Sequence, residues 1–227
     1  MKRTKTLIAS GIALTALAGL AGFGLQTNTI PANALGVSSM TALESSALES
    51  SRATTTYTAD AVHSNVLFKI RHGSVANFYG RFNEIKGTIE FDESDVTNSS
   101  MEFVIPAASV DTNNSSRDDH IRDAEFFNAR QFKNISFEST SITEKTDGVY
   151  TLTGNLTLHG VTREIDATLA EVRTGSFRGK PVIGFEARFS IQRSDYDIMK
   201  YLAEDLSDNG PLGNTVEIIV AIEAGIK

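Results

Sequence analysis

The sequence predicts an all-β fold, and within that class an eight-stranded antiparallel barrel in residues 57–227. Apolar and polar side chains alternate through eight segments of this region, which is the pattern of strands that bury one face. Turn-forming sequences such as Asp147-Gly148 and His159-Gly160 join most of these segments. The longest segments have nine or ten residues, and at ~3.3 Å per residue such strands reach roughly 30 Å, which favours a barrel over a small sandwich.

The strands are expected within residues 63–72, 85–91, 101–107, 132–140, 150–158, 163–169, 183–191 and 215–223. The alternation is clearest in the first of them, where Val66, Phe68 and Ile70 share one face. Gly87 and Gly154 fall on the inferred apolar faces, where a missing side chain permits sharp coiling or leaves internal room.

Between the third and fourth expected strands lies a segment, residues 109–132, that is too long and too charged for a hairpin turn. Residues 118–127 are expected to form a short helix that presents Phe126 and Phe127 to the barrel and keeps its charges outside. A helix or loop in this position is expected to act as a lid on one end of the barrel.

The N-terminal region has the composition of a targeting segment. Lys2, Arg3 and Lys5 precede a Gly- and Ala-diluted apolar stretch, and a small-x-small site follows at residues 32–34. Residues 1–34 are therefore predicted to be a cleaved signal peptide, with an uncleaved anchor as the alternative, and the mature protein is expected to be exported to the periplasm or beyond. Residues 35–56, which repeat ALESS twice, are predicted to be a linker.

Composition excludes several classes of function. The net charge of −7 argues against nucleic acid as a partner, because neutralising phosphates needs a basic surface. The absence of cysteine excludes thiolate metal sites and cysteine nucleophiles. The acidic balance also predicts that any membrane contact is transient, and the sequence neither requires nor excludes a homodimer.

An eight-stranded barrel is either filled by its own side chains or holds one small ligand, and periodicity alone does not separate these alternatives. A structural or protein-interaction barrel with a self-filled core is one hypothesis, and an apolar ligand tunnel is the other. The inward-facing residues that would line a tunnel are Val66, Phe68, Ile70, Ile89, Phe91, Phe103, Ile105, Phe137, Leu156, Phe185, Phe189 and Ile218.

Residues 117–120, Arg-Asp-Asp-His, allow three further interpretations. Asp and His alone are a weak metal signal, and an acid–base pair of Asp118 and His120, as in a hydrolase or isomerase, lacks a nucleophile motif. No metal site and no catalytic residue is therefore predicted. The third interpretation is an ion-pair cluster that fixes the loop, and a polar ring at a cavity mouth would also recognise a ligand's head group. His72, at the end of the first strand and on the face of Phe68, is expected to reach the rim.

Several segments read together resemble the YceI-like family of exported lipid-binding proteins. The matching pieces run from YTADAVHSNVLFKIRH at residue 57 to VEIIVAIEA at residue 216, and the strongest joint signature is R-D-x-H-I-R-x-x-x-F-F from Arg117, followed by L-T-L-H-G-V-T and R-S-D-Y. The chain departs from the family pattern at Gln192, at Tyr196-Asp197 and in the acidic connection 200–214.

The resemblance implies an extended, lipocalin-like barrel with an apolar tunnel for an isoprenoid or fatty-chain lipid, such as a polyprenyl chain or a quinone. It implies no catalysis, no metal and no cofactor other than the bound lipid. Mapped onto this sequence, its head-group contacts fall on Arg117, Asp118, His120, Arg122, Phe126 and Phe127.

Overall fold

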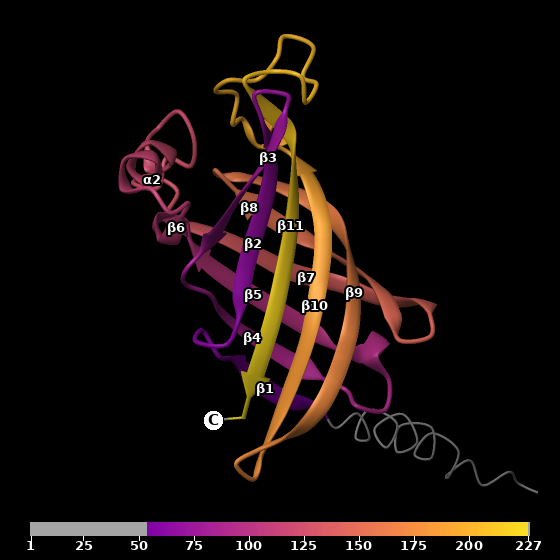
Figure 1. The fold of residues 1–227 in the computed structure, drawn as a ribbon. Coiled ribbons are helices and arrows are strands. Elements are labelled where there is room, and N and C mark those ends of the chain that lie inside the picture. The colour runs from indigo at the N-terminus through magenta and orange to yellow at the C-terminus, as the bar shows by residue number, and fades with distance from the viewer. Residues whose placement is uncertain (1–53, 227) are drawn as a thin grey trace, which may run out of the picture. The chain divides into compact units, whose positions relative to one another are not determined.

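The computed structural model describes residues 54–226, which form a closed eight-stranded antiparallel barrel with one short helix (Figure 1). The fold class expected from the alternation of apolar residues is therefore confirmed. The signal peptide predicted for residues 1–34, and nearly all of the linker predicted for 35–56, lie outside the described residues.

The described chain contains eleven strand segments, three 3-10 turns and one α-helix. The strands are β1 (Thr55–Ala59), β2 (Asn65–His72), β3 (Ala76–Phe82), β4 (Lys86–Phe91), β5 (Ser100–Pro106), β6 (Val110–Asp111), β7 (Asn134–Thr146), β8 (Val149–Leu158), β9 (Val161–Phe177), β10 (Lys180–Gln192) and β11 (Leu212–Gly225). The turns are η1 (Val96–Asn98), η2 (Ala107–Ser109) and η3 (Arg193–Tyr196), and the helix is α2 (Ser115–Arg122).

Eleven segments make eight strands of a barrel because the first three strands are each interrupted once. β1 and β2 both pair with β11, so they are two parts of one barrel strand with a break between them. The breaks between β3 and β4 and between β5 and β6 lie beside that first break in the neighbouring strands. β4 accordingly pairs with β1 while β3 pairs with β2, and β5 pairs with β4 while β6 pairs with β3. The pairing of β1 with β11 closes the ring.

Each of the eight expected strands corresponds to an observed one, and three further segments, β1, β3 and the two-residue β6, were not expected. β3 nevertheless carries the same signal, because Phe78, Gly80 and Phe82 alternate with polar or exposed residues. Its apolar set is only two phenylalanines and a glycine, which is why it does not stand out from a loop in the sequence.

The helix begins and ends earlier than expected. It spans Ser115–Arg122 instead of residues 118–127, because the side chain of Asn114 caps its start by accepting from the backbone N–H of Arg117 at 3.0 Å. The extended backbone of Asp123 ends it. Phe126 and Phe127 lie in the turns that follow, and both still point towards the barrel: Phe126 is buried, and the Phe127 ring lies 5.6 Å from that of Phe82.

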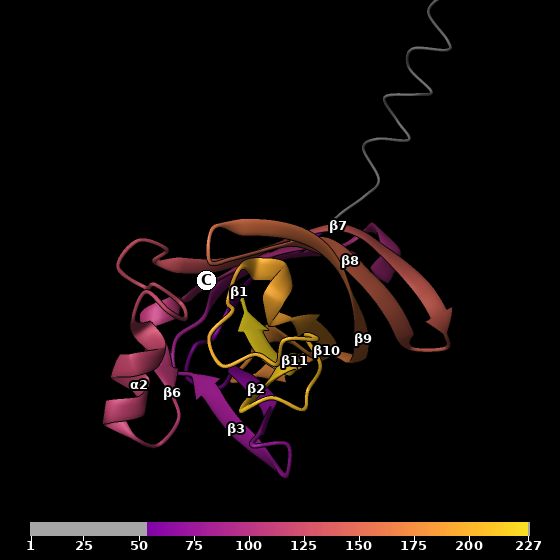
Figure 2. The ribbon, with the colours of Figure 1, turned by 90° about the horizontal axis from the view of Figure 1, so that it is seen from above.

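The two ends of the barrel differ. One end, called here the α2 end, carries α2, the β2–β3 turn (residues 73–75) and the loop of residues 197–211, which lies over the middle of the ring of strands in Figure 2. The opposite end carries the β7–β8 and β9–β10 turns and the start of β1. Within residues 54–226, no helix is long and apolar enough to cross a bilayer.

Candidate functional site

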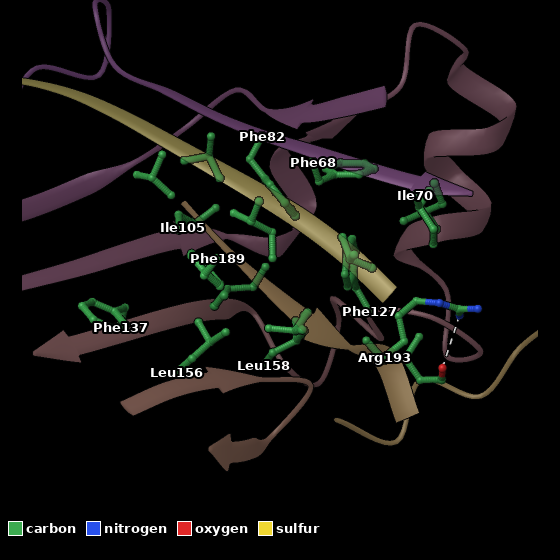
Figure 3. A pocket seen from close by; sticks show the side chains of 18 of the residues that line it. Phe68, Ile70, Phe82, Ile105, Phe127, Phe137, Leu156, Leu158, Phe189 and Arg193 are labelled. Atoms are coloured by element: carbon green, nitrogen blue, oxygen red, sulfur yellow. Dashed lines mark hydrogen bonds between the residues drawn. The ribbon is translucent and has the colours of Figure 1, made fainter. Parts of the chain in front are cut away.

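The barrel encloses an apolar cavity of about 560 Å³ in its half next to the α2 end. Figure 3 shows phenylalanine, leucine and isoleucine side chains converging on it from strands on all sides of the barrel. Its volume falls within the ~300–1,000 Å³ of small-molecule pockets. Polar side chains reach it only near the mouth, where His72, Arg117, His120 and Arg193 line it. Such a cavity suits a ligand with a long apolar part and a small polar head.

Strand alternation places the wall residues. On β2 the inward set is Val66, Phe68 and Ile70, and the pairing of β2 with β11 sets Phe68 opposite Ile218 and Ile70 opposite Val216. Every second side chain along a strand therefore faces the bore, and this holds at every level of the ring.

Three glycines keep the bore open by letting phenylalanine rings lie flat on the wall. A Cβ built on Gly80 would lie 2.2 Å from the Phe68 ring, one on Gly87 would lie 2.1 Å from the Phe103 ring, and one on Gly154 would lie 2.4 Å from the Phe137 ring. A side chain at Gly80 would push the Phe68 ring inwards, whereas one at Gly87 or Gly154 would also meet the backbone oxygen of Glu102 at 2.7 Å or of Glu138 at 2.5 Å. The internal room expected at Gly87 and Gly154 is thus taken by a ring that lies against the sheet.

The Arg117 guanidinium lies at the mouth of the cavity and has no ion-pair partner among the described carboxylates. Arg117 donates from Nε to Thr112 Oγ1 at 2.8 Å and from Nη2 to the Thr112 carbonyl at 2.7 Å, and its guanidinium lies 4.6 Å from the centre of the Phe78 ring. These contacts hold the charge beside the opening, where it is available to an anionic or carbonyl-bearing head group.

A second polar group joins the α2 segment to the loop of residues 197–211 across the mouth. Glu125 contacts the Lys200 ammonium, and its other oxygen lies 3.5 Å from His120 Nε2. The hydrogen bond from Lys200 lowers the pKa of Glu125 and raises the pKa of Lys200. The rings of His120 and Phe126 both lie edge-on or tilted to Tyr201, at 6.3 and 6.1 Å. This cluster of Glu125, Lys200, His120, Phe126 and Tyr201 closes one side of the mouth.

Arg193 anchors the same loop from inside. Its guanidinium donates to the carbonyls of Gly213, Ile198, Lys200 and Leu212 at 2.8 to 3.3 Å, and its side chain is buried. Burial lowers its pKa to about 10, so that it stays charged at neutral pH. The four carbonyls belong to both ends of the loop, so one side chain fixes the loop over the barrel.

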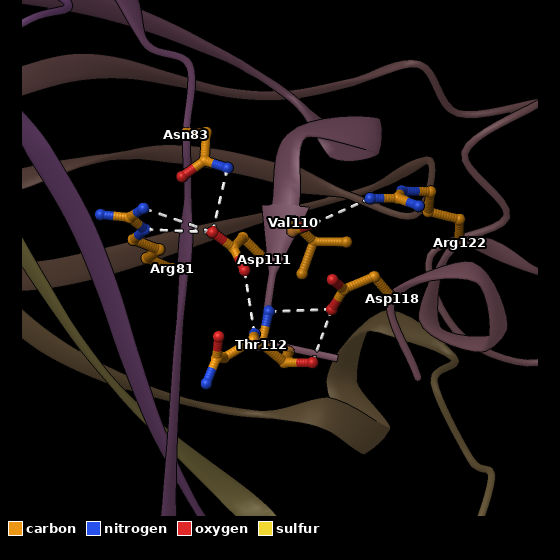
Figure 4. A network of polar contacts seen from close by, with 8 residues as sticks. Arg81, Asn83, Val110, Asp111, Thr112, Asp118 and Arg122 are labelled. Carbon is orange, nitrogen blue, oxygen red and sulfur yellow. Dashed lines mark hydrogen bonds and ion pairs between the residues drawn. The ribbon is translucent and has the colours of Figure 1, made fainter. Parts of the chain in front are cut away.

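Asp118 and Arg122, expected at the rim, do not line the cavity. Figure 4 shows that both serve to attach α2 to β6. Asp118 is buried and accepts from the N–H and the hydroxyl of Thr112 at 2.8 and 2.5 Å. Arg122 donates to the carbonyls of Ala108 and Val110 and to Asp119. The physical reason is the helix register, which turns these two side chains towards the strand while Arg117, Ile121 and His120 face the opening.

Ile89 and Phe91, expected on the tunnel wall, also do not line the cavity. They lie towards the opposite end, where they border a void of only about 10 Å³, and Ile89 is fully buried. They point inwards as expected, but at a level where neighbouring side chains fill the bore. The other expected tunnel residues, Val66, Phe68, Ile70, Phe103, Ile105, Phe137, Leu156, Phe185, Phe189 and Ile218, all line the cavity, as do His72, Arg117, His120, Phe126 and Phe127. Their contact with a ligand remains a prediction.

Some lining residues were not anticipated. Phe78 and Phe82 come from β3, and their alternation is the signal that could have found them. Arg193, Ile198, Tyr201 and Pro211 come from η3 and the loop that follows, and no periodicity identifies residues of a loop.

Two groups of polar residues bear on the catalytic and metal-binding interpretations considered from the sequence. Asp118 and His120 make no hydrogen bond to each other, and His120 pairs with Glu125. Asp60, His63 and Glu223 are the one group within residues 54–226 that has metal-ligating atoms close together, within 4.8 Å. A hydrogen bond of 2.8 Å between Asp60 Oδ2 and His63 Nδ1 already accounts for part of this closeness.

Comparisons with known proteins agree with this architecture. Residues 57–224 match the model of the YceI-like domain family. Protein YceI of Salmonella newport (strain SL254) is 37% identical over 163 residues, covering 71% of this chain and 81% of that protein. The crystal structure of the Campylobacter jejuni YCEI protein is similar with a TM-score of 0.60 and 26% identity, covering 70% of this chain and 91% of that one.

A polyisoprenoid binding domain from Saccharophagus degradans, implicated in plant cell wall breakdown, shares the fold with a TM-score of 0.56 and 17% identity, covering 75% of this chain and 98% of that one. The family match spans nearly the whole described barrel, and it confirms the resemblance drawn from the sequence. This chain therefore belongs to the YceI-like domain family.

Proposed function

We propose that this protein binds one isoprenoid lipid, of the polyprenyl or isoprenoid quinone type, or a similar fatty-chain lipid, inside its barrel, and that it acts outside the cytoplasm as a carrier or buffer for that lipid. The observation that carries the proposal is the apolar cavity of about 560 Å³ with cationic and imidazole groups only at its mouth. The polyisoprenoid binding domain that shares the fold supports the choice of ligand class.

The driving force is burial of the tail. Each CH₂ removed from water contributes ~0.8 kcal/mol, so a five-carbon unit gains roughly 3–4 kcal/mol before the cost of ordering the chain. The head group lies at the mouth, where Arg117 and His120 offer hydrogen bonds to a phosphate or a quinone carbonyl. Tail burial supplies the affinity, and the mouth selects the head group.

Binding proceeds without catalysis in this proposal. The acid–base pair considered from the sequence, Asp118 and His120, is not assembled, since Asp118 is committed to Thr112. An activity screen in which His120→Ala lost a hydrolytic or isomerising activity shown by the wild type would contradict this.

Export follows in the proposal from the targeting composition of residues 1–34. Fractionation of cells that express the full chain, with mass spectrometry of the mature N-terminus, tests it. Protein found in the cytoplasm with residue 1 retained would contradict it.

The decisive experiment is to purify the full chain, extract it with organic solvent and identify any bound lipid by mass spectrometry. An isoprenoid lipid in stoichiometric amount is expected. An empty protein that also takes up no polyprenyl alcohol or quinone would overturn the proposal.

Matched variants test whether the cavity is the place of binding. Gly80→Ala is expected to push the Phe68 ring into the bore and to weaken lipid uptake at least ~10-fold, because the displaced ring takes up tail volume. Gly175→Ala is the control, since a Cβ there meets nothing nearer than 4.0 Å. Equal uptake by both variants would place the lipid elsewhere.

The alternative function is a structural or protein-interaction barrel filled by its own side chains. The half towards the opposite end favours it locally, because Ile89, Leu169 and Ile183 are almost completely buried there. This alternative predicts that the same extraction and mass spectrometry find no bound lipid.

A further inference from the structure

The cavity ends inside the barrel and does not continue to the opposite end. Met101 on β5 and Phe185 on β10 line both the cavity of about 560 Å³ and the void of about 10 Å³ beyond it. Both side chains are buried, at 4% and 6% exposure. These two side chains therefore separate the two spaces, and we call them the floor.

The floor is supported from the side and from below. The Phe103 ring meets the Phe185 ring edge-on at 6.3 Å, and Phe103 is itself held against Gly87. Beyond the floor, Ile89, Leu169 and Ile183 are 0%, 1% and 1% exposed. A tail that reaches the floor meets a packed core that has no room to give way.

The depth from the floor to the mouth follows from one strand. Phe185, Ala187, Phe189 and Ile191 all line the cavity on β10. The stretch from Phe185 to Ile191 measures roughly 20 Å along the strand at ~3.3 Å per residue, and somewhat less along the barrel axis because barrel strands are tilted. The cavity thus has a fixed depth that is shorter than the barrel, because β10 continues past the floor to Lys180.

We propose that Met101 and Phe185 set the longest tail that the protein can bury, so that it selects its lipid by chain length. This rests on the proposed function and adds the specificity-determining residues. Tails up to the depth of the cavity gain affinity with each added unit, and longer tails leave their excess in water and gain nothing more.

The test uses four prenyl alcohols of increasing length, namely geraniol, farnesol, geranylgeraniol and solanesol, delivered in cyclodextrin. Native mass spectrometry of the full chain with equimolar pairs measures which alcohol is preferred. Each step up to geranylgeraniol is expected to raise affinity at least ~10-fold, and solanesol is expected to bind no tighter than geranylgeraniol.

Variants of the two floor residues and of two wall residues nearer the mouth sharpen the test. Met101→Ala is expected to shift preference towards solanesol ~10-fold, and the milder Phe185→Leu by less, because the deleted side-chain atoms leave room for further carbons of the longer tail. Ala187→Leu, one inward position nearer the mouth, is expected to raise the floor and to shift preference from geranylgeraniol to farnesol. Phe189→Ala is the matched wall variant, expected to weaken all four alcohols while leaving their relative order unchanged.

The outcomes separate the two proposals. If wild-type protein binds none of the alcohols, both the lipid-binding function and the floor are overturned. If it binds them with affinity that still rises to solanesol, lipid binding stands and the floor is wrong. A shift in Phe189→Ala as large as in Met101→Ala would also overturn the floor.

Discussion

The two halves of this barrel are built from the same strands with the same alternation, yet one is hollow and the other solid. In the half near the α2 end, Phe68, Phe82, Phe137 and Phe189 point inwards and are only half-buried, because part of each ring faces the cavity (Figure 3). In the other half, Ile89, Leu169, Ile183 and Ala224 are almost fully covered. An inward-facing position is therefore a different physical environment at different levels of one barrel.

The difference arises from which residues share a level. Glycines beneath three phenylalanine rings, and Ala167 and Ala187 on neighbouring strands, leave the middle of the hollow half open. Branched aliphatic side chains from facing strands fill the solid half. A binding cavity and a core that stabilises the fold are thus kept in separate parts of one domain.

The largest expected effect contrasts the two halves directly. Leu169→Ala is expected to cost ~3–4 kcal/mol in the free energy of unfolding, because it leaves a new void in a packed core. Phe189→Ala is expected to cost less than half as much in the ligand-free protein, since its ring already borders a cavity. Urea unfolding measures both, and equal losses would show that the two halves are packed alike.

The next effect concerns the loop over the hollow half. Arg193→Met removes the donors to four carbonyls, two in the loop and two at the start of β11. It is expected to lower the free energy of unfolding by ~2–3 kcal/mol and to speed amide hydrogen exchange across residues 197–211. Arg188→Met is the control, because this arginine lies on β10, the strand that leads directly into η3, with its side chain 61% exposed. Unchanged exchange in Arg193→Met would mean that the loop is held by other contacts.

A smaller effect is expected at Tyr196, whose hydroxyl is buried and has no hydrogen-bond partner among residues 54–226. Tyr196→Phe is expected to change stability at neutral pH by no more than ~1 kcal/mol, and in the stabilising direction, because it removes an unpaired polar atom. Burial raises the pKa of Tyr196 from 10.0 to about 12. The unfolded chain therefore loses this proton first, and stability falls as the pH rises from 10 to 12.

The alkaline fall in stability is therefore expected to be less steep in Tyr196→Phe than in the wild type. Arg193 acts in the opposite direction over this range, because its pKa is lowered from 12.5 to about 10, and its contribution cancels when the two proteins are compared. Parallel pH profiles of the wild type and the variant would contradict the assignment to Tyr196.

The smallest effect lies at the strand break on the solid half. The hydrogen bond that the His63 ring donates to the Asp60 carboxylate raises the pKa of His63, and the charge of Glu223 adds the smallest contribution. Asp60→Asn is expected to lower the pKa of His63, as measured by NMR titration of its ring protons, and Glu223→Gln is expected to lower it less. A larger fall in Glu223→Gln than in Asp60→Asn would contradict this order of the two contributions.

Much of the fold was predictable because strand alternation is a local signal. Each of the eight expected strands has its observed counterpart, and the inward residues of β2, β5 and β10 were assigned to the correct face. The short apolar set of β3 was missed, and the helix was placed three residues late because Asn114 was not recognised as its cap.

The candidate site was predictable only in part. Phe91 and Phe103 both face inwards, yet Phe103 lines the cavity and Phe91 the packed end. Likewise, Arg117 and Asp118 are adjacent in sequence, but Arg117 lines the mouth of the cavity, whereas Asp118 is buried against Thr112 and does not line it. The alternation of side chains along a strand tells which residues face inwards. The level of a residue along the barrel axis depends on how strands from distant parts of the chain are staggered against one another.

The amino-acid sequence by itself determined the class of fold, the identity of the inward faces and the membership of the family, since each of these is written in local periodicity and in motifs. Only the tertiary structure decided where along the bore the side chains leave space and where they close it. Empty volume is a property of all the side chains that meet at one level, and no single segment of the chain contains that information.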